Sequence, residues 1–169
     1  FDSTLFLDAA TVVLDRLDYG FDQAERFSFA CSICECPYAR RFTALAGHGD
    51  LVEYNTGVIF FTHWERELFQ VWRSIADSMD SRLRFLHNGS VITMPINDQP
   101  SFALAVRQAH RNPFVLPMNW NFRPQWHRGF FGPVKIWHDY SAPSDSFLRV
   151  NLEQLDPQNV IDFIPCEVR

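Results

Sequence analysis

The best guide to the fold of this chain is the stretch Leu5-Phe6-Leu7-Asp8-Ala9-Ala10-Thr11-Val12-Val13-Leu14. An apolar run leads directly into one carboxylate, Asp8, and apolar residues resume after a short turn. This pattern predicts a buried strand over residues 4–7 and a short extension over 12–14. Ligands of open α/β sheets collect at the carboxyl ends of the strands, so Asp8 stands where chemistry usually occurs.

Three further motifs follow along the chain. They are Tyr54-Asn55-Thr56-Gly57-Val58-Ile59-Phe60-Phe61, then Asn97-Asp98-Gln99-Pro100, and finally Pro133-Val134-Lys135-Ile136-Trp137-His138. Together with the first stretch they resemble, in order, four motifs of the GT-A-fold glycosyltransferases: the metal-binding Asp-x-Asp turn, the "NTGV" strand, the "DQ" helix start and the "KIxH" strand. This chain departs from the family at Ala10, which stands at the position of the second acid. The resemblance covers residues from about 4 to 140 and fades in the last 29 residues.

The resemblance implies an α/β fold with a GT-A-like (nucleotide-diphospho-sugar transferase) mixed sheet flanked by helices. A length of 169 residues fits a single glycosyltransferase-like domain, with a core over about 4–140 and a tail over 141–169. The strand-helix-strand half that binds the nucleotide base in such domains does not precede Asp8, so we expect the carboxy-terminal part of the domain. The implied function is transfer of a sugar from a nucleotide-diphosphate-sugar donor to an unknown acceptor.

The resemblance also implies roles for individual residues. Asp8 and His138 match metal ligands, and oxygen donors with one imidazole suit Mn²⁺ or Mg²⁺. Asp98 and Gln99 match a catalytic pair that contacts the donor sugar near the reacting carbon. The residues that match the substrate-binding strand are Asn55, Thr56 and Gly57.

The charges of this chain are unevenly spread. The net charge is −5, yet no Asp or Glu occurs from Gln99 to His138, whereas five basic residues do. This basic window predicts an anionic ligand such as a diphosphate rather than nucleic acid, and an ordinary solvated surface is the alternative. Because Ala10 removes one metal ligand, the metal dependence is open. The candidates to neutralise a diphosphate without metal are Lys135, Arg123 and Arg128.

Simpler roles compete with several of these assignments. Trp120 lies in an aromatic loop over 119–131, where it is a candidate to stack on a sugar or to cover the core. Asp8 is also consistent with a turn carboxylate, and His138 with a histidine of the core. Asn55 is also consistent with a strand-end amide, and Asp98 with a helix N-cap.

Cysteine usage leaves two interpretations. Cys31, Cys34 and Cys36 form a C-x-x-C-x-C cluster that suits zinc with His48 or Cys166 as a fourth ligand. Only one such knuckle is present, so free thiols in a reducing compartment are the favoured interpretation. The sequence contains no signal peptide and no apolar run long enough to span a membrane, so we expect a cytoplasmic location.

Two other functional classes fit parts of the sequence. Asp8-Ala9-Ala10-Thr11 resembles the nucleophile motif of haloacid-dehalogenase-like phosphohydrolases, with Lys135 as their lysine, but no late pair of acids follows it. A non-catalytic binding domain derived from a glycosyltransferase is the second alternative, and Ala10 favours it.

The remaining patterns predict secondary structure. Apolar residues at helical spacing predict a helix over 63–79, and further helices are expected over 21–26, 37–45 and 100–109. Strands are expected over 27–31, 53–61, 114–117 and 134–137, with a hairpin over 84–94 that turns at Asn88-Gly89. From Ala142 we expect a loop and then a short strand over 160–164.

Overall fold

The computed structural model of this chain describes residues 2–34, 50–94, 96–127, 132–156 and 158. The helix expected over 37–45, the strand expected over 160–164 and the candidate Arg128 lie outside the described residues. Within the described ranges, no helix is both long and apolar enough to cross a membrane.

A mixed four-stranded sheet forms the centre of the fold. Its strands are β1 (Ser3–Leu7), β4 (Tyr54–Thr62), β3 (Phe29–Ile33) and β7 (Phe114–Val115), in the order β1-β4-β3-β7. β4 is antiparallel to β1 and β3, whereas β3 and β7 are parallel. The strands expected over 4–7 and 53–61 are confirmed within one residue at each end. β4 is buried along almost its whole length, because both faces of the sheet are covered.

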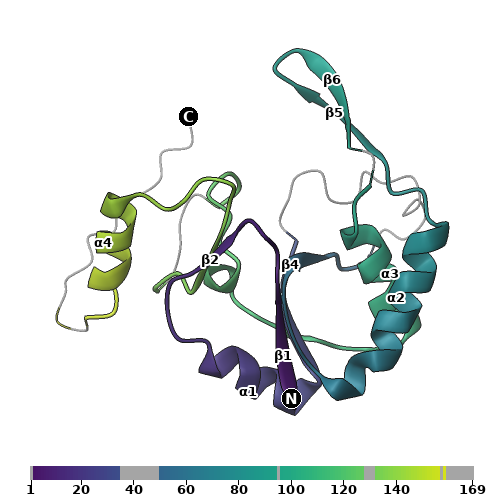
Figure 1. The fold of residues 1–169 in the computed structure, drawn as a ribbon, viewed down its shortest axis with the longest axis horizontal. Coiled ribbons are helices and arrows are strands. Elements are labelled where there is room, and N and C mark those ends of the chain that lie inside the picture. Colours follow the sequence, from purple (N-terminus) through teal and green to yellow (C-terminus); the bar gives the residue numbers. More distant parts are fainter. Residues whose placement is uncertain (1, 35–49, 95, 128–131, 157, 159–169) are drawn as a thin grey trace.

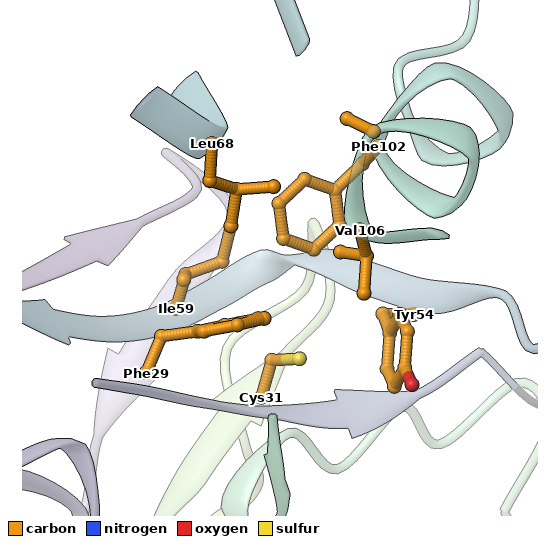
Figure 2. Close-up of a cluster of buried hydrophobic side chains, with 8 residues drawn as sticks. Phe29, Cys31, Tyr54, Ile59, Leu68, Phe102 and Val106 are labelled. Atoms are coloured by element: carbon orange, nitrogen blue, oxygen red, sulfur yellow. The ribbon is translucent and has the colours of Figure 1, made fainter. Parts of the chain in front are cut away.

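Helices pack on the two faces of the sheet (Figure 1). On one face lies α1 (Asp18–Phe27), and on the other lie α2 (Arg66–Ser78), preceded by the short helix η2 (His63–Glu65), and α3 (Gln99–Gln108). Successive side chains of β4 point to opposite faces, so Ile59 joins the α2–α3 side and Phe60 joins the α1 side. Figure 2 shows the α2–α3 cluster. Its buried members are Phe29, Cys31, Tyr54, Ile59, Leu68, Phe102, Ala105 and Val106.

Two small antiparallel pairs complete the strands. β2 (Thr11–Val13) pairs with β8 (Ile136–His138), and this register sets Thr11 opposite His138. β5 (Leu83–His87) and β6 (Ser90–Met94) form the expected hairpin, which extends away from the sheet (Figure 1). Asn88 and Gly89 have φ angles of 50° and 80°, which is the left-handed backbone that this tight turn requires.

The prediction of a loop after Ala142 is wrong, because residues Asp145–Glu153 form the helix α4. Ser144 caps this helix by accepting a hydrogen bond from the amide of Phe147. The Phe147 ring packs on those of Phe122 and Trp137. The packed structure therefore continues past Tyr140, beyond the limit that the motifs indicate.

Candidate functional site

Asp8 lies directly after β1, in a turn that fixes its carboxylate. Its amide donates to the carbonyl of Gly57 at 2.9 Å, which ties the turn to β4. Asp8 Oδ1 accepts from the amide of Ala10 at 3.2 Å, and the Asp8 carbonyl accepts from both the amide and the hydroxyl of Thr11. Asp8 is thus a turn carboxylate, as one interpretation expected. The second carboxylate oxygen, Oδ2, takes no part in the hydrogen bonds of this turn, and the Asp8 side chain is half exposed.

That second oxygen faces His138 at the end of β8. His138 Nε2 lies 3.7 Å from Asp8 Oδ2, although the two residues are 130 positions apart in the sequence. The prediction that these side chains lie close together is confirmed. Gly57 makes the contact possible, because a Cβ atom there would lie 2.2 Å from His138 Cε1. The imidazole of His138 therefore occupies the space that a side chain at position 57 would need.

The surroundings of His138 favour its neutral form. Burial lowers the pKa of the imidazole, the carboxylate of Asp8 raises it in part, and the positive charge of Arg123 lowers it again. Together these effects place the pKa of His138 below the ordinary value of a histidine. A neutral imidazole retains the lone pair that a metal ligand needs.

A chain of amide side chains leads from His138 to the start of α3. His138 Nδ1 is 2.8 Å from Asn121 Oδ1, and Asn121 Nδ2 donates to Asn55 Oδ1 at 2.7 Å. Asn55 Oδ1 also accepts from the amide of Gly57 at 2.9 Å, and Asn55 Nδ2 donates to Gln99 Oε1 at 3.1 Å. The structure thus brings Asn55, Gly57, Gln99 and His138 together. Asn121 was missed, because nothing in the local sequence distinguishes it from Asn119.

Asp98 and Thr56 occupy different environments. Asp98 is the N-cap residue of α3 but its side chain makes no capping hydrogen bond, and it is exposed. Asn97 Oδ1 accepts from the amide of Gln99 instead. Thr56 is buried within β4 beside Asn55.

The described part of the basic window contains ion-paired residues and one guanidinium, that of Arg123, with two atoms that lack a hydrogen-bond partner among the described residues. Lys135 forms an ion pair with Asp15, and this partner holds the pKa of the Asp15 carboxyl below its usual value. Arg111 pairs with Glu65 and Glu67. Arg123 is buried, and its Nε and Nη2 have no hydrogen-bond partner in the described part of the chain. Of the two described candidates for a diphosphate, only Arg123 is therefore without an acidic partner.

Trp120 belongs to the core rather than to an open surface. It lies in η3 (Met118–Trp120), is 5% exposed and packs against the rings of Phe60 and Tyr19. Of the two roles considered for Trp120, the structure favours covering the core over stacking on a sugar.

The described cysteines are thiols of the interior. Cys31 and Cys34 are both buried, and neither forms a disulfide bond within the described part of the chain. The Cys31 sulfur lies in the α2–α3 cluster (Figure 2), where burial raises the pKa of the thiol. This apolar environment favours the interpretation of Cys31 as a free thiol. Cys36, His48 and Cys166 lie outside the described residues.

Asp8 and His138 fit two ligands of one divalent cation. Their separation of 3.7 Å is less than twice the usual ligand distance of about 2.0–2.6 Å. Among the described residues, no group of three His, Cys, Asp or Glu side chains gathers around such a point. The lost acid at Ala10 is therefore not replaced by another acidic side chain in the described ranges.

The chain is similar in structure to the apo form of mouse xyloside xylosyltransferase 1. The TM-score is 0.55, the sequence identity is 16%, and the similarity covers 85% of this chain and 60% of that one. The fold is GT-A-like. The chain spans about 60% of the length of the mouse protein. No family model and no curated protein sequence matches it.

This fold argues against the haloacid-dehalogenase-like alternative. That chemistry needs a lysine beside the nucleophilic Asp8. Lys135, the only lysine of the chain, instead pairs with Asp15. The pairing of Lys135 and the GT-A-like fold therefore do not favour a phosphohydrolase.

Proposed function

We propose that this chain binds a nucleotide-diphosphate-sugar and transfers the sugar to an acceptor. The observation that carries the proposal is the pair Asp8–His138. Their side chains come from two distant motifs and face each other at 3.7 Å on a GT-A-like fold. A fold alone does not determine a function, so the proposal depends on this pair and its surroundings.

The reaction makes a specific electrostatic demand. Breaking the bond between the anomeric carbon and the diphosphate develops negative charge on the leaving group. Asp8 and His138 would hold Mn²⁺ or Mg²⁺, and such a cation, when bound, offsets that charge. The guanidinium of Arg123 lies near enough to His138 to lower its pKa. Its buried Nε and Nη2 have no hydrogen-bond partner in the described ranges, and a phosphate oxygen that reached them would supply one.

The sugar would be held at the start of α3. Gln99 is linked to Asn55 by a hydrogen bond, so its amide has a fixed place near the pair Asp8–His138. Asp98 precedes it with an exposed carboxylate that makes no capping bond. This carboxylate is free to hydrogen-bond a sugar hydroxyl or to stabilise positive charge near the reacting carbon.

A non-catalytic sugar-nucleotide-binding domain is the second candidate. The observation that favours it is Ala10, because the family's second acid is missing and no described acid replaces it. Binding of a donor without any transfer or hydrolysis would identify this class.

Calorimetry tests the proposal directly. UDP- and GDP-sugars are titrated into the protein with and without Mn²⁺, and sugar release is followed separately. We expect metal-dependent binding by the wild type, and a loss of that binding in Asp8→Asn and His138→Gln. The matched control is Asp80→Asn, which removes an exposed acid that pairs with Arg82. Failure of the wild type to bind any donor would refute the proposal, as would unchanged binding by Asp8→Asn.

Restoring the lost acid separates metal-dependent from metal-free binding. Ala10→Asp adds a second hard oxygen ligand beside Asp8, so Mn²⁺ and the donor should bind more tightly if a cation is used. If Arg123 alone neutralises the diphosphate, the new carboxylate should repel the donor and weaken its binding with or without metal.

A further inference from the structure

The amide chain beside His138 has a direction that follows from one backbone group. The Gly57 amide can only donate, so the Asn55 atom that it meets at 2.9 Å is an oxygen. The Asn121 atom that lies 2.7 Å from this oxygen must then be the donor, Nδ2. Asn121 therefore turns its carbonyl oxygen toward His138 Nδ1, which lies 2.8 Å away. An amide oxygen only accepts, so Nδ1 carries the hydrogen.

We propose that Asn121 is a positioning residue that holds His138 as the Nδ1–H tautomer. Asn55 and the backbone of Gly57 set the orientation of Asn121. A neutral imidazole with its hydrogen on Nδ1 has its lone pair on Nε2, the atom that faces Asp8 Oδ2. Two acceptors then face each other across the site, an arrangement that a cation between them satisfies. The use of this lone pair for metal rests on the proposed function, whereas the tautomer does not.

Burial keeps the direction of the chain from reversing. Asn121 is 1% exposed and Asn55 is 5% exposed, so water is not available to replace a lost partner. A flipped Asn121 would set its oxygen against Asn55 Oδ1 and its NH₂ group against the Nδ1–H of His138. Both contacts would leave polar groups unsatisfied.

The backbone amide of Gly57 also determines which atoms donate and accept where the chain of amide side chains reaches Gln99. Because Asn55 Oδ1 accepts from Gly57, its Nδ2 is the group that donates to Gln99 Oε1. The NH₂ group of Gln99 therefore takes no part in this hydrogen bond, and under the proposed function it would donate to an oxygen atom of the ligand. One backbone N–H thus determines that the site offers a lone pair at His138 and a donor at Gln99.

Nitrogen-15 NMR of the metal-free protein tests the tautomer without any activity assay. The spectrum is recorded at about pH 8, where a histidine is neutral. The chain contains six histidines, and the signals of His138 are those absent from His138→Gln. We expect the shift of a protonated nitrogen at Nδ1 and of an unprotonated nitrogen at Nε2. The reverse pattern in the wild type would overturn the proposal.

Two substitutions at Asn121 separate positioning from packing. Asn121→Leu keeps the approximate volume but removes the acceptor, so the Nδ1–H signature should be lost and Mn²⁺ should bind about 10- to 100-fold more weakly. Asn121→Asp keeps an acceptor for His138, so the signature and most of the Mn²⁺ affinity should be retained even if stability falls. The matched control Asn119→Leu removes a hydrogen bond to the carbonyl of Pro133 and should leave His138 unchanged.

The outcomes distinguish this inference from the proposed function. An Nδ1–H signature that survives in Asn121→Leu would refute the role of Asn121. An Nδ1–H signature that is lost in Asn121→Leu supports the role, even if the wild type binds neither Mn²⁺ nor a nucleotide sugar. In that last case the proposed function fails and the positioning role stands. If Asn121→Leu does not fold, the wild-type spectrum and Asn121→Asp decide.

Discussion

Gly57→Ala should disable the site through a single methyl group. The new Cβ would lie 2.2 Å from His138 Cε1 and 2.7 Å from His138 Nδ1. An ordinary van der Waals contact begins at 3.4 Å, so the Cε1 atom of His138 must move away by about 1.2 Å, the difference between 3.4 Å and 2.2 Å. A shift of that size breaks the alignment of His138 with both Asn121 and Asp8. We expect Mn²⁺ to bind about 10- to 100-fold more weakly, which is a loss of about 1.4–2.8 kcal/mol of binding free energy.

Two measurements, made on Gly57→Ala and on a control variant, separate a loss of Mn²⁺ affinity from a general loss of stability. Calorimetry gives the Mn²⁺ affinity, and urea unfolding gives the stability, which overpacking should lower by about 1–3 kcal/mol. The control Gly89→Ala has no atom within 4 Å of its new Cβ, but its φ of +80° is strained for alanine. It should lose about 1 kcal/mol of stability and no Mn²⁺ affinity. The reasoning would be refuted if Gly57→Ala folded and bound Mn²⁺ as tightly as the wild type.

Three further predictions concern the surroundings of the pair Asp8–His138. Arg123→Gln should weaken nucleoside diphosphate binding measured by calorimetry, whereas Lys135→Gln, which removes a cation already paired with Asp15, should mainly lower the free energy of unfolding. Because the folded protein holds the pKa of His138 below its unfolded value of about 6.5, the unfolded state binds more protons as the pH falls below that value. The contribution of His138 to stability is therefore complete above about pH 6.5 and is lost as the pH falls toward its folded pKa, so His138→Gln should lower the slope of unfolding free energy against pH in this window. Phe147→Ala removes a ring that packs on Phe122 and Trp137 and should destabilise the protein by about 3–5 kcal/mol in urea unfolding, and an unchanged midpoint would contradict that packing.

The central elements could be predicted because their signals are local. The helix over 63–79 and the hairpin at Asn88-Gly89 follow from apolar spacing and turn chemistry, and both are present. The proximity of Asp8 and His138 could be predicted only through the order of the motifs, since no local pattern connects residues 130 positions apart.

The missed features depend on partners that are distant in sequence. Asn121 meets Asn55 across 66 positions, and Lys135 meets Asp15 across 120, so neither pairing has a local signature. The helix α4 was missed for a different reason. Ser144 is a favoured N-cap residue, but the neighbouring Pro, Ser and Asp residues are equally typical of loops.

The docking of α4 satisfies the backbone of Val134, just before β8. Asn151 Oδ1 accepts from the amide of Val134 at 2.6 Å, and Asn151 Nδ2 donates to the carbonyl of Val134 at 3.1 Å. A single side chain thus satisfies both the N–H and the C=O of one residue just before β8. Val134 is fully buried, and a buried backbone group without a partner costs about as much free energy as a lost hydrogen bond. Asn151 therefore completes the hydrogen bonding of the buried segment that leads into the strand of His138, and it does so from a helix that lies outside all four motifs.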